Sequence, residues 1–226
     1  MNASCSVRMR QLCVLALPYT CAFALDIIIQ MVSLSYTGSL SSSVYLSGLG
    51  LAISIVNVFG LSLLYGFAFG YDTLGSQAIG ALNYVKAGKI FNKAKIILLV
   101  VSFCLFPIFL FAGNFLTLLS ISDGIADSVN LYMRIVYLGV ILKPQTMLIR
   151  IHMKAQRVTW PTLVAQLISL ILHFGWLELF LKYFEFGLAG VCVATLIAFS
   201  TEFFIDYIFL HSIASIKKES LQPFSR

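Results

Sequence analysis

Polar side chains recur at helical spacing inside long apolar stretches of this sequence. Asp26, Gln30 and Ser33 follow one another at steps of four and three residues, which places them on one face of a helix. Ionisable groups cost about 3 kcal/mol at the centre of a bilayer, so they usually face a cavity or a partner. This face could line a water-filled passage in which Asp26 exchanges a proton or holds a cation. It could equally make a structural hydrogen bond or ion pair with a neighbouring helix.

A second polar face occurs later in the chain. Gln166, Ser169, His173 and Trp176 are separated by three, four and three residues, so they also share one helical face. Histidine gains or loses a proton near neutral pH, which would suit proton-linked transport. A single histidine inside a membrane is, however, more often only hydrogen-bonded between helices. The sequence leaves both interpretations open.

Charged residues also lie within apolar stretches. Glu202 and Asp206 are one helical turn apart, and because two such carboxylates repel, one of them could hold a proton at neutral pH. Alternatively, both lie near the membrane surface and are hydrated. Lys143 could pair with one of these acids or extend toward lipid headgroups. Glu178 and Lys182, four residues apart, suit a local ion pair that we interpret as structural.

The elements that must position these side chains are membrane-spanning helices. Of the 226 residues, 60% are hydrophobic and 11% are charged, whereas soluble domains have about 25% charged residues. A spanning helix needs about 20 apolar residues to cross a hydrocarbon core of about 30 Å. Six apolar stretches meet that requirement, at about 11–35, 44–74, 95–119, 129–150, 162–181 and 187–210. We therefore predict an all-α integral membrane protein built as a six-helix bundle.

Lysine and arginine cluster on alternate connections between these stretches. The clustered cations are Arg8, Arg10, Lys86, Lys89, Lys93, Lys95, Arg150, Lys154, Arg157, Lys217, Lys218 and Arg226. The other connections carry Asp123, Asp127 and one cation, Lys182. Because an excess of lysine and arginine marks the cytoplasmic side, we predict that both termini are cytoplasmic.

This topology predicts three segments. Residues 1–10 form a cytoplasmic N-terminus, 11–210 the six-span lobe and 211–226 a cytoplasmic tail. The pattern does not distinguish the plasma membrane from an internal membrane. The net charge of +6 is explained by this topology, so we expect the partner to be the lipid bilayer and not nucleic acid.

The sequence lacks the motifs of a soluble enzyme or a metal site. It contains no nucleophile elbow, HExxH, P-loop or dinucleotide-binding pattern, and connections of about ten residues leave no room for a soluble active site. The five cysteines show no CxxC spacing and fit a role as small apolar fillers; they are Cys5, Cys13, Cys21, Cys104 and Cys192. We therefore expect neither an enzyme nor a bound cofactor.

The second span ends in a distinctive order of small and polar residues. Its matching positions are Gly66, Asp72, Thr73, Leu74, Gln77, Gly80 and Ala81. This order resembles a signature of the multidrug and toxic compound extrusion (MATE) family. Gly66 and Gly70 also form a GxxxG step, which lets another helix approach closely.

Three further stretches support the resemblance, which covers about residues 14–210. The run LAISIVNVFG, which contains Asn57, is similar to the family's Leu-Ala-x-Ser-x-x-Asn-x-x-Gly stretch. Gln156 and Pro161 match its Gln-x-x-x-x-Pro turn, and Gly187 and Gly190 match the Gly-x-x-Gly that opens the sixth span.

The resemblance implies a cation-coupled antiporter that exports organic, often cationic, compounds in exchange for protons or sodium. The family fold has two six-helix lobes around a central cleft. Twelve spans would need about 240 residues, so this chain would be the amino-terminal lobe, working with a second lobe or another copy. The residues expected to line its cleft are Asp26, Gln30, Ser33, Asn57, Gln166 and His173.

Four positions differ from the family pattern, two of them being His173 and Leu177, where the family tends to have Asn. Ser39 stands where many members have His, and Ser33 stands where bacterial members have a cation-binding Asp. An alternative from a different class is a truncated or non-transporting scaffold subunit. Such a protein would tolerate Leu at Asp26 and Phe at His173.

Overall fold

The computed structural model describes residues 2–40 and 42–221, without the side chains of 2–8 and 11. The side chains of Cys5 and Arg8, and the whole of Arg226, therefore lie outside the described part of the chain. Within the described residues, six helices are long and apolar enough to cross a membrane. The predicted six-helix membrane bundle is confirmed.

The first span is α1 (Asn2–Gly38), and the second is a continuous run of α2 (Ser43–Ile55), the π-helical η1 (Val56–Leu61) and α3 (Ser62–Gly80). The third is divided into α4 (Tyr84–Cys104), α5 (Phe106–Leu110) and α6 (Ala112–Leu118). The fourth is α7 (Asp123–Ala155), and the fifth is α8 (Trp160–Glu178) with the π-helical η2 (Leu179–Tyr183). The sixth is α9 (Gly187–Ser212), and the 3₁₀-helix η3 (Lys218–Leu221) follows it.

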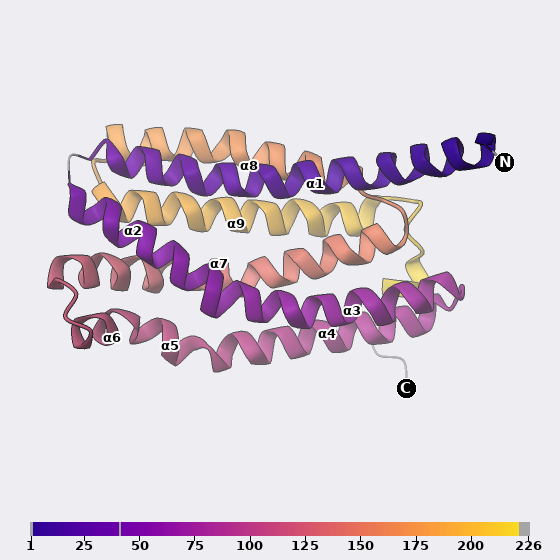
Figure 1. Cartoon of the computed structure of the whole chain (residues 1–226), viewed down its shortest axis with the longest axis horizontal. Helices are drawn as coiled ribbons and strands as arrows, with labels where there is room; N and C mark the ends of the chain where they lie inside the picture. The colour runs from indigo at the N-terminus through magenta and orange to yellow at the C-terminus, as the bar shows by residue number, and fades with distance from the viewer. Residues whose placement is uncertain (1, 41, 222–226) are drawn as a thin grey trace.

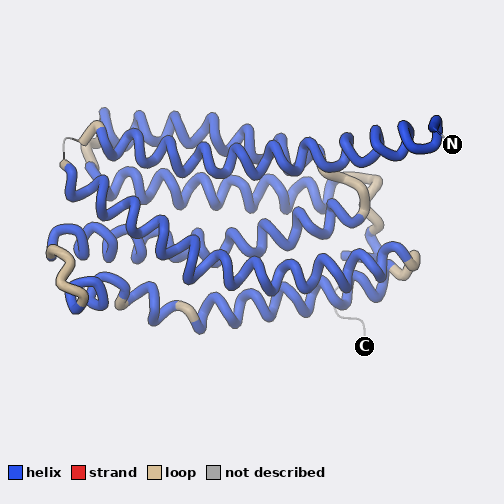
Figure 2. Tube along the Cα trace, viewed as in Figure 1, coloured by secondary structure: helices blue, strands red, loops and turns tan. Residues whose placement is uncertain are grey.

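Helix α7 occupies the middle of the bundle, where it packs against α2, α3, α4 and α9. Helix α8 bridges α9 and α1 on the other side, and short turns join the long helices (Figures 1 and 2). The start of α1 and the 3₁₀-helix η3 lie at the same end of the bundle (Figure 1), as an even number of spans requires. We call it the basic end, since Lys86, Lys217 and Lys218 lie there.

The basic end extends the helices beyond the apolar stretches of the sequence. The cations Lys86, Lys89, Lys93 and Lys95 lie inside α4, and Arg150 and Lys154 lie inside α7, so these basic clusters lie on the ends of helices and not in loops. A helix continues while its backbone hydrogen bonds are satisfied, and apolar composition marks only the part in hydrocarbon. Arg150 pairs with Asp206 of α9, and Lys95 lines a hollow between α4, α7 and α9.

Close helix packing does not occur at the predicted GxxxG step. Gly66 and Gly70 are exposed, and a Cβ added at either would meet no atom within 4 Å. The close approach is at Gly48, where an added Cβ would lie 2.4 Å from the Ser128 Cβ of α7. The expectation for Gly66 and Gly70 was wrong within this lobe, because α3 directs its buried face elsewhere.

The segment after α9 folds back onto the basic end and packs against α4. Ile216 and Ser220 are buried, and a Cβ added at Gly88 of α4 would lie 2.7 Å from the Ser220 carbonyl oxygen. At least part of the predicted 211–226 tail is therefore integrated into the lobe; 222–226 are outside the described residues.

Candidate functional site

Lys143 of α7 lies at the centre of a buried ionic network. Its ammonium pairs with Asp26 of α1 and, at 2.9 Å, with the Glu202 carboxylate of α9. Only 3% of the Lys143 side chain and none of the Glu202 side chain is exposed. Of the two alternatives that the sequence left open for Lys143, the structure shows the pairing with an acid of the sixth span and not the extension toward headgroups.

Arg150 lies two turns further along α7 and extends the network. Its Nε donates to Asp206 Oδ2 at 2.6 Å, and its Nη2 lies 3.6 Å from Glu202 Oε2. Glu202 and Asp206 are fully buried, so the alternative in which both are hydrated at the membrane surface is wrong. Cations two turns apart on α7 face acids one turn apart on α9, which holds the acids inside the bundle.

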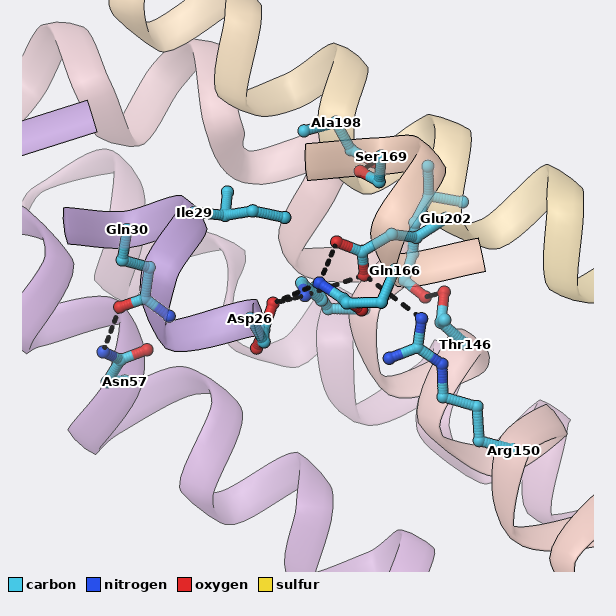
Figure 3. A network of polar contacts seen from close by, with 12 residues as sticks. Asp26, Ile29, Gln30, Asn57, Thr146, Arg150, Gln166, Ser169, Ala198 and Glu202 are labelled. Atoms are coloured by element: carbon cyan, nitrogen blue, oxygen red, sulfur yellow. Dashed lines mark hydrogen bonds and ion pairs between the residues drawn. The ribbon is translucent and has the colours of Figure 1, made fainter. Parts of the chain in front are cut away.

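Gln166 brings α8 into the same network (Figure 3). Its Nε2 donates to Glu202 Oε1 at 3.1 Å and to Asp26 Oδ1 at 3.5 Å. Four helices, α1, α7, α8 and α9, are therefore joined at one point. Asp26 therefore forms the ion pair with a neighbouring helix that the sequence allowed. Its partner Lys143 also pairs with Glu202, so Asp26 belongs to a larger group of titratable side chains.

The network contains one more acid than cation. Lys143 and Arg150 face three carboxylates, from Asp26, Glu202 and Asp206, which leaves one negative charge in excess if all five groups are ionised. An uncompensated charge in a low-dielectric interior is strongly unfavourable. One proton, or one monovalent cation, would make the network neutral.

Polar atoms without a hydrogen-bond partner identify where such a charge could be held. Asp206 Oδ1, Gln166 Oε1 and Arg150 Nη2 are buried and make no hydrogen bond within the described residues. A free carboxylate oxygen beside an excess negative charge is suited to accept a proton. In the same described part of the chain, no group of three His, Cys, Asp or Glu side chains is arranged to hold a metal ion.

The network reaches the outside through Asp26, whose side chain is 18% exposed. A hollow beside it lies between α1, α3 and α7 and is lined by Asp26, Tyr65, Lys143 and Arg150 among others. Its free volume of about 10 Å³ matches the space that one water molecule needs. A single water could therefore connect the surface to the buried charges.

The other residues predicted for a cleft lie apart from this network. Ser33 Oγ and His173 Nε2 are 2.9 Å apart, and both residues are buried among helix contacts with Ala194 and Thr195. Gln30 accepts a hydrogen bond of 3.1 Å from the Asn57 amide (Figure 3). The residues predicted to line a cleft therefore form three separate pairs: Asp26 with Gln166, Ser33 with His173, and Gln30 with Asn57. Only the first pair belongs to the ionic network.

The residues of the family signature lie mostly at the basic end. Asp72 pairs with Lys154 of α7 at 2.6 Å. Gln156 donates to Ser220 at 3.2 Å and accepts from the Lys217 amide at 2.8 Å, which anchors the segment after α9. Gly66, Thr73, Gln77 and Gly80 are exposed, and Pro161 begins α8.

A structural ion pair at the opposite end is confirmed. Glu178 and Lys182 form a salt bridge, and the Tyr36 hydroxyl donates to Glu178 at 2.6 Å. This pair joins α1 to α8 far from the five-group network.

Comparisons with known proteins agree on one family. A family model described as MatE matches residues 18–176. Protein DETOXIFICATION 7 of Arabidopsis thaliana is 26% identical over 206 residues, covering 89% of this chain and 40% of that protein. Multidrug and toxin extrusion protein 1 of Danio rerio is 29% identical over 171 residues, covering 76% and 29%.

Among solved structures, the chain is similar to the crystal structure of the eukaryotic MATE transporter AtDTX14. The TM-score is 0.90 at 20% identity, and the match covers 96% of this chain and 48% of that one. The chain thus has the fold of one half of a solved transporter, and it spans about 40% or less of the two curated relatives named above.

Proposed function

Because the chain belongs to the MATE family, we propose that it forms one lobe, the amino-terminal one, of a cation-coupled exporter of small organic compounds. The observation that carries this proposal is the buried network with one acid in excess. A second six-helix lobe, or another copy of the chain, would complete the transporter. Both termini would then be cytoplasmic, because the basic end carries the lysines and arginines.

The network offers a physical route from proton binding to helix movement. With a proton on one carboxyl, the five groups are neutral and α7 and α9 are held together. When the proton leaves, one negative charge is uncompensated. The ion pairs that join α1, α7 and α9 must then rearrange. A packed interior tends to switch between discrete arrangements and not to deform gradually. Proton exchange would thus bias the lobe between two packings.

The exported compound would bind between this lobe and its partner. Transporters of this general design alternate by moving one bundle against another around a fixed site. The role of the present lobe is therefore to supply the proton-linked movement and one wall of the site. We propose the proton as coupling ion, because Asp206 Oδ1 is the one buried carboxylate oxygen of the network without a hydrogen bond in the described residues, and a proton needs one such oxygen whereas sodium is normally surrounded by several.

Efflux from proteoliposomes tests this proposal. The chain, alone and together with its second lobe, is reconstituted in vesicles loaded with ethidium, and a proton gradient is applied. We expect efflux when two lobes pair, either this chain with its second lobe or two copies of this chain, and we expect it to fall at least tenfold with the double substitution of Glu202→Gln and Asp206→Asn. Glu219→Gln, at an exposed acid of η3, is the matched control and should leave efflux unchanged. Efflux that is absent with both lobes present would overturn the transport proposal.

A further inference from the structure

A second hollow lies at the basic end, on another part of the lobe. It has a volume of about 230 Å³ and is enclosed by α4, α7, α9 and the end of η3. Its polar lining comes from Asn92, Lys95, Gln145, Tyr207 and His211, and none of its lining residues is acidic. The hollow therefore favours an anionic group.

Lys95 is the cation of this hollow. It lies inside the span formed by α4, where its ammonium is 4.6 Å from the centre of the Phe91 ring. Across the described part of the chain, no carboxylate lies within salt-bridge distance of it. A cation inside a span normally pairs with an anion or faces water. The hollow beside Lys95 leaves room for an anion supplied from outside the chain.

The depth of the hollow matches the headgroup region. Lys95 lies eleven residues from the start of α4, or about 16 Å at 1.5 Å per residue, while His211 is in the last turn of α9. The 27-residue span from Tyr84 to Leu110 is about 40 Å long, longer than the hydrocarbon core of about 30 Å. If the excess of about 10 Å lies at the basic end, the Lys95 backbone is about 6 Å inside the hydrocarbon edge, and its side chain can extend toward a headgroup drawn into the hollow.

The surroundings of the hollow suit acyl chains. On α4, Ile96 and Val100 are 50% and 56% exposed; on α9, Phe204 and Ile208 are 59% and 58% exposed. Ile96 and Val100 follow Lys95 along α4, and Phe204 and Ile208 precede His211 along α9. All four are therefore further from the basic end than Lys95 or His211 of the same helix. A molecule with an anionic head and apolar tails would satisfy the cation and cover these surfaces together.

We propose that this hollow binds the phosphate of one anionic phospholipid, held by Lys95 and His211. Basic pockets between transmembrane helices on the cytoplasmic side are suited to such headgroups. The bound lipid would link α4 to α9 and to Leu221 at the end of η3. This site is separate from the five-group network and does not depend on the transport proposal.

Native mass spectrometry of the purified chain with added dioleoyl phosphatidylglycerol tests the site. We expect one lipid to remain bound, with dioleoyl phosphatidylcholine bound at least fivefold more weakly. Lys95→Met should weaken phosphatidylglycerol binding about fivefold, as expected for one lysine, and Lys95→Arg should retain it. Lys93→Met, at an exposed lysine of the same helix, is the matched control and should bind as the wild type does.

A second variant guards against misfolding of the first. His211→Phe removes the second side chain proposed to bind the lipid phosphate and leaves no unpaired charge in the interior. It should also weaken phosphatidylglycerol binding. Equal binding by the wild type, Lys95→Met and His211→Phe would overturn the proposal. Displacement of the lipid by equimolar inorganic phosphate would assign the hollow to free phosphate and would also overturn it.

Discussion

Replacing Lys143 by methionine is expected to destabilise the lobe by about 3–5 kcal/mol, the usual cost of removing one partner of a buried ion pair. The substitution leaves Asp26 and Glu202 without their shared cation, and Arg150 alone then faces three carboxylates. Methionine has a similar length, so packing is largely preserved and the loss reports charge. The measurement is the free energy of unfolding in mixed detergent micelles.

Two variants separate this effect from a general intolerance of mutation. Adding Glu202→Gln to Lys143→Met removes a carboxylate as well, and we expect it to recover part of the lost stability. Lys154→Met removes the cation that pairs with Asp72 on the same helix, but both side chains are about 30% exposed. It should cost about 1 kcal/mol or less. Equal losses for Lys143→Met and Lys154→Met would contradict the buried network.

Replacing Gly48 by leucine is expected to destabilise the lobe by about 3 kcal/mol, the upper part of the range for overpacking a well-packed interior. An added Cβ at Gly48 would lie 2.4 Å from the Ser128 Cβ and 3.3 Å from the Ile125 carbonyl oxygen. The second atom belongs to the backbone of α7, so the helices α2 and α7 must separate. The same unfolding measurement reports the loss.

The matched control is Gly66→Leu, on α3 of the same span. A Cβ added there meets no atom within 4 Å, and the larger side chain should change stability little. If Gly66→Leu were the more damaging of the two substitutions, the packing assigned to α2 and α7 would be wrong.

The fold could be predicted from the sequence because a membrane imposes a simple rule. Each span must satisfy its own backbone hydrogen bonds and present apolar side chains to lipid, so the six spans and the common location of both ends can be read from hydropathy alone. Helix ends could not be read in this way. Arg150 and Lys95 lie beyond or at the edge of apolar stretches, yet the helices continue through them.

The sequence predicted five of the six residues of the site. The sixth, Arg150, could have been found from its spacing along the helix. Asp26, Gln166, Glu202, Asp206 and Lys143 were singled out as polar groups within spans, and they do meet. Arg150 was missed as a member, although it lies seven residues after Lys143 and therefore on the same helical face. What spacing could not reveal is which faces meet, because that depends on the packing of α7 between α3 and α9.

His173 shows the opposite case. Its helical spacing with Gln166 was correct, since both point into the bundle. Their surroundings differ by two turns of α8, however: His173 is hydrogen-bonded to Ser33 and to the Ala194 carbonyl oxygen, and Ser33 in turn contacts Thr195. One periodic face can thus contain both a charged centre and an uncharged, hydrogen-bonded helix contact.

The proton on the five-group network is measured most directly by infrared difference spectroscopy of the chain in lipid, recorded while the pH is lowered. The account predicts a carboxylic acid C=O band from one buried carboxyl, lost when Asp206 is replaced by Asn and unaffected by the exposed Glu219→Gln control. A band that persists in the Asp26→Asn, Glu202→Gln and Asp206→Asn variants alike, or no band at all, would contradict it.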